Sequence, residues 1–77
     1  MSKDSIQDVV RKSLDKYFKD LGEQNPSDVY QMVVFTVELP ILEAVMDRAG
    51  GNQSLAAEML GINRNTLRKK LQQHSLL

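Results

Sequence analysis

The sequence predicts an all-α protein of four helices in a single domain, residues 1–77, ending in a helix-turn-helix. Apolar residues recur at steps of three and four along the chain, and asparagine or glycine stands where the last helices should begin or end. A chain of 77 residues has room for one domain. It buries only about 60 to 65% of the surface that its unfolded form exposes. Because there is no cysteine to form a disulfide, oligomerisation is the expected reinforcement.

The first helix is predicted from about residue 6 to residue 21, with Ser5 as its cap and Gly22 as its end. Its apolar stripe consists of Ile6, Val9, Val10, Leu14, Tyr17, Phe18 and Leu21. Acidic and basic residues alternate at a spacing of four on the other face, which is typical of a solvated helix surface.

A second helix is predicted after the loop 22–27, capped by Asn25 or Ser27, with Pro26 or Asp28 in its first turn. Many β-branched residues between positions 29 and 37 make a strand the alternative. The apolar pattern continues with helical spacing to about residue 49, and this length favours a helix.

Pro40 should bend this second helix between residues 36 and 40, because it lacks a backbone donor and crowds the carbonyl of Thr36. The first half of the helix is apolar nearly all round and needs more cover than one short partner helix supplies. We therefore expect residues 5–49 to form the dimerisation helices of a homodimer. Met32 and Met46 should fill the core.

The charges divide the chain into two unlike parts. Residues 1–52 hold six Lys/Arg and nine Asp/Glu, a net charge of −3, whereas residues 53–77 hold four and one, a net charge of +3. The longest apolar run, 32–35, is four residues, so we expect no membrane span, no secretory signal and a cytoplasmic location.

The stretch GGNQSLAAEMLGINRNTLRKKL, residues 50–71, predicts a helix-turn-helix within residues 52–77. Asn52 should cap a third helix to about Leu60, Gly61 should make the turn, and Asn63 should cap a fourth helix to about His74. The predicted contact surface between the two helices consists of Ala56, Ala57, Met59, Leu60, Ile62, Leu67 and Leu71.

The fourth helix carries most of the side chains that are predicted to bind DNA. A rotation of about 100° per residue puts Lys69 nearly opposite Leu67 and Leu71, and no acidic residue occurs from Met59 to Leu77. Arg64 suits the O6 and N7 acceptors of guanine, and Lys69 can reach the same atoms or a phosphate. Phosphate contacts are expected from Asn52, Ser54, Thr66, Arg68 and Lys70.

The quoted stretch, together with VVRKSLDKYFKDL and DVYQMVVFTVELPILEAVMDRAGGNQ, resembles the Fis (factor for inversion stimulation) family of bacterial DNA-bending, nucleoid-associated proteins. The resemblance implies an intertwined homodimer with a four-helix core made by the first two helices of each subunit. It also implies a bent duplex, because the recognition helices lie closer than the about 34 to 36 Å of one straight helical turn. The residues it assigns to double-stranded DNA are Asn52, Ser54, Asn63, Arg64, Thr66, Arg68, Lys69 and Lys70.

The chain departs from the family pattern at several places. Longer members carry an N-terminal hairpin arm that touches a recombinase, and the chain as given has none, so stimulation of DNA inversion is not expected. Fewer cations should weaken the outer phosphate contacts. The departures are Asn65 for Gly, Ser54 for Thr, Gly50 and Leu55 for Arg, and Gln72 and Gln73 for Lys.

Two other functions stay open. The chain could be a dimeric helical module that binds a protein, or the isolated DNA-binding domain of an enhancer-binding transcription activator. Met1 and the compact size favour a free-standing protein. An enzyme is not expected, since His74 is the single histidine and there is no phosphate-binding glycine loop. We expect no cofactor and no metal.

Overall fold

The computed structural model describes residues 3–77, which fold into four helices and no strands. The helices are α1 (Lys3–Leu21), α2 (Val29–Arg48), α3 (Gln53–Leu60) and α4 (Arg64–Gln73). The prediction of an all-α chain is therefore confirmed, and the β-branched segment after residue 29 is helical. Its apolar periodicity outweighs the strand propensity of its valines.

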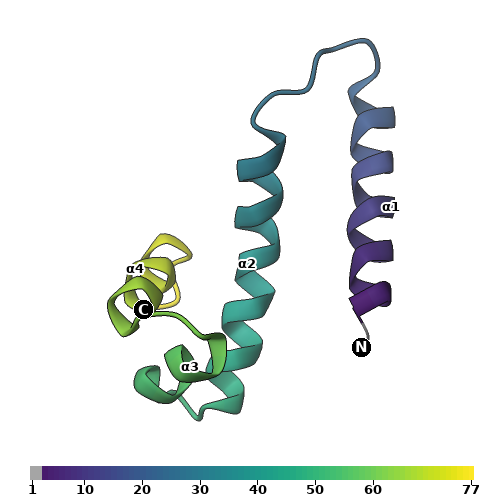
Figure 1. Ribbon diagram of the computed structural model, residues 1–77. Coiled ribbons are helices and arrows are strands. Elements are labelled where there is room, and N and C mark those ends of the chain that lie inside the picture. The colour runs from purple at the N-terminus through teal and green to yellow at the C-terminus, as the bar shows by residue number, and fades with distance from the viewer. Residues whose placement is uncertain (1–2) are drawn as a thin grey trace.

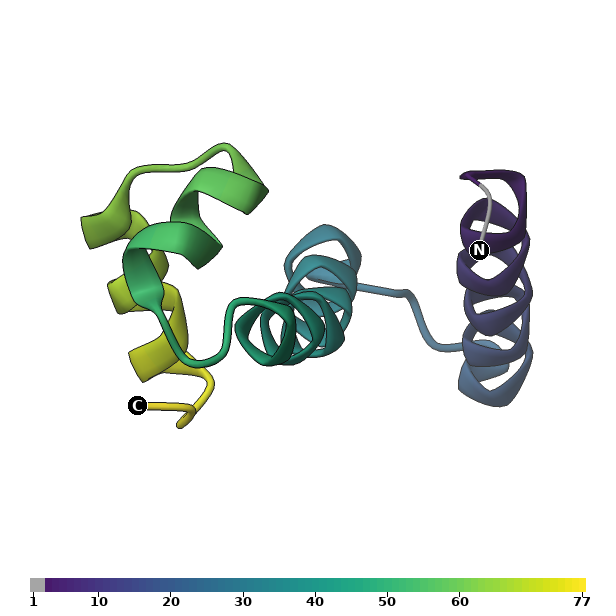
Figure 2. The ribbon, with the colours of Figure 1, turned by 90° about the horizontal axis from the view of Figure 1, so that it is seen from below.

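The helix α2 is the central element of the chain. Figures 1 and 2 show α1 on one side of it and the compact pair α3 and α4 on the other. The chain runs up α1, reverses through the loop 22–28 and returns down α2 (Figure 1). The radius of gyration is 14.9 Å, against about 11 to 12 Å for a compact domain of this length. The single protomer is thus extended rather than closed.

The starts of the first two helices differ from the prediction. Helix α1 begins at Lys3, so Ser5 lies in its first turn and is not its cap. Helix α2 begins at Val29, which leaves Asn25, Pro26 and Ser27 in the loop. Its N-cap is Asp28, at φ 53° and without a capping side-chain hydrogen bond. The chain must reverse direction here, and Asp tolerates the left-handed backbone that the reversal needs.

Pro40 lies inside α2, and the helix continues on both sides of it. Proline leaves the carbonyl of Thr36 without its usual donor. The hydroxyl of Thr36 donates to the carbonyl of Met32 at 2.7 Å, a pattern that often accompanies helix bending. The bend at residues 36–40 stays a prediction.

The buried core lies entirely in the C-terminal part of the described chain. It consists of Leu42, Ala49, Ala56, Ala57, Leu67 and Leu71, with Val45, Met46, Leu60 and Ile62 packed against it. Met46 thus fills the core as predicted, whereas Met32 is 36% exposed in the single protomer. Helix α1 contributes no residue to this core, and its apolar stripe is at most half-buried within the protomer.

By length and composition alone, α2 could also cross a bilayer. The expectation that no segment is long and apolar enough to span a bilayer was wrong, because it considered only the length of unbroken apolar runs. Thr36, Glu38 and Pro40 interrupt the apolar run, but the mean hydropathy of α2 stays high enough for a membrane span. Such a helix is also typical of a soluble protein whose apolar faces are covered by other helices.

Candidate nucleic-acid interface

The boundaries of α3 and α4 are fixed by the residues that the sequence indicated. The Oδ1 atom of Asn52 accepts a hydrogen bond from the backbone N of Leu55 at 3.1 Å. The Oδ1 atom of Asn63 accepts one from the backbone N of Asn65 at 2.7 Å. Each cap satisfies a backbone donor that a helix N-terminus otherwise leaves free. The two asparagines therefore start the two helices, as predicted.

The turn between the helices depends on Gly61, which has φ 73°. In this left-handed region a side chain crowds the following carbonyl, and glycine avoids that penalty. The backbone N of Gly61 donates to the carbonyl of Glu58, and that of Ile62 donates to the carbonyl of Ala57, each at 3.1 Å. These bonds close α3 and set the direction in which α4 leaves.

Small residues on α3 and leucines on α4 hold the two helices together. Ala56 and Leu67 are fully buried, and Ala57 and Leu71 nearly so. The alanines let α4 approach α3 closely, because they add little volume between the helices. Met59 was predicted in this contact surface but is 46% exposed.

The predicted DNA-contacting residues are spread over the start of α3 and the outer side of α4. Seven of the eight are exposed, namely Asn52, Ser54, Asn63, Arg64, Thr66, Arg68 and Lys69. They are free to meet a large ligand, while the buried Leu67 and Leu71 hold the opposite side of α4. No acidic residue lies on this helix or in the turn before it, so the exposed surface of α4 is cationic. Contact with DNA stays a prediction for each of these residues.

The eighth residue, Lys70, lies in a different environment. Its Nζ atom is 2.8 Å from Oε2 of Glu38 on α2, and the residue is only partly exposed. The sequence pattern and the resemblance both placed Lys70 on a phosphate. In the structure Lys70 ties α4 to α2, because it lies on the side of α4 that faces the long helix, and its contact with a phosphate stays a prediction.

His74 ends α4, as predicted, but it also makes contacts that the sequence did not indicate. Its Nε2 atom lies 3.0 Å from Oε1 of Glu38. Its ring stacks on that of Phe35, with centroids 4.1 Å apart and planes inclined by 18°. Only 1% of the His74 side chain is exposed. The one sign of these contacts in the sequence is Glu38 within an apolar helix, because a carboxylate that is largely buried needs a partner.

The charge on Glu38 is stabilised by these partners. The hydrogen bond from Lys70 is the largest cause that lowers the pKa of Glu38 below its ordinary value of 4.5. Partial burial acts in the opposite direction, and the hydrogen bond with His74 and the nearby positive charge of Lys70 lower the pKa further. The carboxylate is therefore the favoured form at neutral pH.

Comparisons with known proteins agree with this geometry. The sequence pattern of the family described as bacterial regulatory protein, Fis family, matches residues 35–74. A relative from Ralstonia nicotianae, named a Fis-like DNA-binding protein, is 61% identical over 77 residues, all of both chains. A relative of the same name from Neisseria meningitidis serogroup B is 57% identical over 72 residues, which is 94% of this chain and 91% of that protein.

A third relative, the DNA-binding protein Fis of Proteus mirabilis, is 45% identical over 71 residues, 92% of this chain and 72% of that protein. The matched region 35–74 holds α3, the turn, α4 and residues 35–48 of α2. The two ends of the contact between α2 and α4, Phe35 and His74, are also the two ends of this region. The chain belongs to the Fis family of bacterial regulatory proteins.

Proposed function

We propose that the protein binds double-stranded DNA as a homodimer and bends it, with α4 as the recognition helix in the major groove. The observation that carries this proposal is the surface of α4, which exposes Arg64, Arg68 and Lys69 and has no acidic neighbour on its helix. A helix surface that serves only solubility mixes charges of both signs. The relatives named DNA-binding proteins support the same assignment.

Within this surface the residues have different expected tasks. Arg64 stands at the first position of α4, the part of a recognition helix that reaches base edges. Lys69 is on the exposed side one and a half turns later. Ser54 and Arg68 suit phosphate oxygens, and so does the amide nitrogen of Asn52, whose oxygen is already used by the cap. Phosphate contacts orient the protein, and base contacts specify the sequence.

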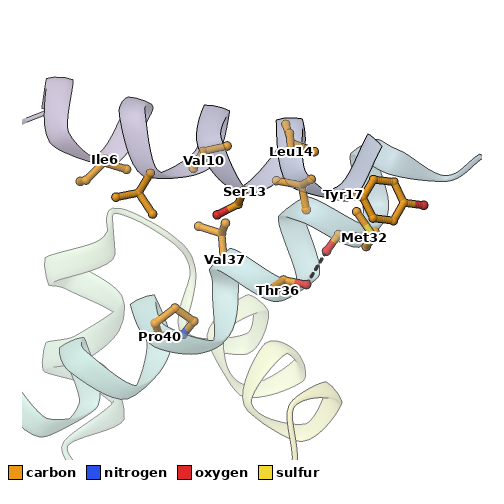
Figure 3. Close-up of a pocket in the computed structure, with 11 residues that line it drawn as sticks. Ile6, Val10, Ser13, Leu14, Tyr17, Met32, Thr36, Val37 and Pro40 are labelled. Carbon is orange, nitrogen blue, oxygen red and sulfur yellow. Dashed lines mark hydrogen bonds between the residues drawn. The ribbon is translucent and has the colours of Figure 1, made fainter. Parts of the chain in front are cut away.

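The homodimer is supported by an apolar groove between α1 and α2, with a volume of about 480 Å³. In Figure 3, Ile6, Val10, Leu14 and Tyr17 of α1 face Val37 and Met32 of α2 across it. A second hollow shares Val10, Val33 and Val37 with this groove and extends it to the exposed Val34 and Ile41. Continuous apolar surface of this kind marks an interface.

A second copy of the chain is a better cover for the apolar surface of α2 than a lipid bilayer is. Glu38 and Glu43 lie in the middle and second half of α2, and Glu38 is bonded to the end of α4. A charged side chain at the centre of a membrane-spanning helix costs about 2.5 to 3.5 kcal/mol on insertion scales. In a homodimer both carboxylates can stay at the edge of the apolar contact. We infer a location in the cytoplasm on the nucleoid.

Bending follows if the two α4 helices of the dimer lie closer than one turn of straight DNA. Curving a site of about 20 to 30 base pairs by about 40 to 90° costs on the order of 1 to 6 kcal/mol. Sites with flexible pyrimidine-purine steps or A/T-rich centres should then be preferred, even where no side chain touches a base. The protein would organise the chromosome and regulate transcription through this shape preference, with no catalysis and no cofactor.

The deciding experiment measures binding to a labelled duplex across a series of salt concentrations. We expect log K to fall linearly with log salt, with a slope of about −0.9 for each phosphate neutralised. Energy transfer between dyes at the two duplex ends should report a shorter distance in the complex. Sedimentation of the free protein should give twice the protomer mass. A protomeric species at working concentration, or no binding in dilute salt, would contradict the proposal.

A further inference from the structure

Two residues of α2 and two residues at the end of α4 form the polar and aromatic contact between these helices. On α2, Phe35 and Glu38 are three residues apart, and on α4, Lys70 and His74 are four apart, so each pair lies on one side of its helix. Glu38 accepts from Lys70 at 2.8 Å and from His74 at 3.0 Å, and Phe35 covers the imidazole ring. We call these four residues the α2–α4 latch.

The latch is a second attachment of α4, separate from the hydrophobic core. The core holds Leu67 and Leu71 of α4 against Leu42 and the alanines of α3. The latch holds the last turn and the C-cap of α4. Its residues on α2 lie one to two turns closer to the start of α2 than Leu42, the core residue. A helix packed at one place can swing about that place, whereas a helix held at two separated places keeps its direction. Sub-ångström positioning of this kind requires supporting residues that are themselves locked.

We infer that Glu38 is a positioning residue for DNA binding and that Lys70 serves the latch rather than a phosphate. This inference rests on the proposed function, in which α2 belongs to the dimer core. The latch then fixes the direction of each recognition helix relative to that core. The distance and angle between the two α4 helices of the dimer follow from it, and with them the curvature of the bound duplex.

The energetics favour a latch that stays closed in the complex. Only 16% of the Glu38 side chain is exposed. If Lys70 left for a phosphate, this partly buried carboxylate would lose its closest cation, and an uncompensated charge is costly away from water. Lys69, which is exposed and has no carboxylate within ion-pair distance among the described residues, meets a phosphate without that loss.

The test compares Lys70→Ala with Lys69→Ala in the salt series on the full chain. Loss of a phosphate contact makes the slope of log K against log salt shallower by about 0.9. We expect this change for Lys69→Ala and no change of slope for Lys70→Ala. The latch variant should still weaken binding about 2- to 30-fold, as residues that act through others do. An equal loss of slope for both variants would overturn the inference.

Glu38→Gln provides the second arm, because the amide keeps the size of the side chain and removes its charge. It should reproduce the Lys70→Ala effect on affinity and on end-to-end energy transfer, and the double variant should be no worse than either single one. In denaturant titrations without DNA, the two substitutions should likewise couple rather than add. Additive effects there would show that the latch does not exist, whether or not the protein binds DNA. Absence of DNA binding by both the unaltered protein and Lys69→Ala would instead reject the proposed function.

Discussion

The rings of Phe35 and His74 stack 4.1 Å apart, although 39 positions separate them in the sequence. Phe35 lies in the first half of the long helix α2, and His74 is the C-cap of α4. The contact joins the two ends of the region that matches the Fis family, and Gly61 and the two asparagine caps define the turn within that region. Its strength can be measured directly.

Replacement of His74 by alanine should destabilise the fold by about 1 to 3 kcal/mol. The estimate combines an aromatic pair of about 0.5 to 1.5 kcal/mol with a hydrogen bond of about the same size. Midpoints of denaturant unfolding give the change. Gln73→Ala, at the exposed neighbouring position, is the control and should stay within about 0.5 kcal/mol. Equal stability of the two variants would mean that the stack contributes nothing.

Stability should depend on acid through Glu38. The folded state lowers the pKa of Glu38 below 4.5, so its contribution is complete above the pKa of the unfolded chain. The contribution is lost as the pH falls through the folded pKa, when the carboxylate binds a proton and the bonds to Lys70 and His74 weaken. Thermal melts from pH 7 down to pH 3 should therefore show a smaller acid-induced loss for Glu38→Gln than for the unaltered protein. Parallel curves for the two proteins would contradict this assignment.

Replacement of Arg64 by alanine should reduce discrimination between a preferred duplex and an unrelated one by about 1 to 3 kcal/mol. Arg64 is the first residue of α4 and is exposed. Lys69→Ala should weaken both duplexes more evenly. Competition titrations with the two duplexes measure the ratio, and Gln72→Ala serves as the control on the same helix. An unchanged ratio for Arg64→Ala would remove this residue from the base contacts.

A polar replacement in the groove should weaken the homodimer. Val33 and Val37 both line the groove between α1 and α2. Val37→Asn places an amide in the apolar contact, where it loses its hydrogen bonds to water. Its melting temperature should be lower and should depend more steeply on protein concentration. Gln31→Ala, exposed on the same helix, is the matched control. Melts that are independent of concentration would exclude a coupled dimer.

Gly61→Ala should destabilise the helix-turn-helix by about 1 to 2 kcal/mol, the cost of a left-handed backbone for a residue with a Cβ. Apart from Gly61 and its two chain neighbours, no residue comes within 4 Å of the position that the Cβ would take, so the cost is conformational and not a clash. Gly61→Asn should cost less, because asparagine tolerates this region. Denaturant midpoints of the two variants test the order. Equal losses would point to a steric cause.

Much of the local structure was determined by the sequence alone. The asparagine caps, the glycine turn and the small residues of α3 act over a few neighbours, so Asn52, Asn63 and Gly61 could be assigned without coordinates. The Fis family itself was also visible in the motif of residues 50–71. The start of α2 was missed because Asp28 takes a backbone conformation that the reversal of the loop imposes.

Tertiary structure decided the parts that depend on which side of a helix meets a distant one. Helical periodicity put Lys70 on the flank of the polar surface of α4, and only the packing of α4 against α2 brought it to Glu38, 32 residues away. The same packing buried the side chain of His74. Periodicity records angles about one helix axis, whereas the crossing of two helices is set by the volumes of all the side chains between them.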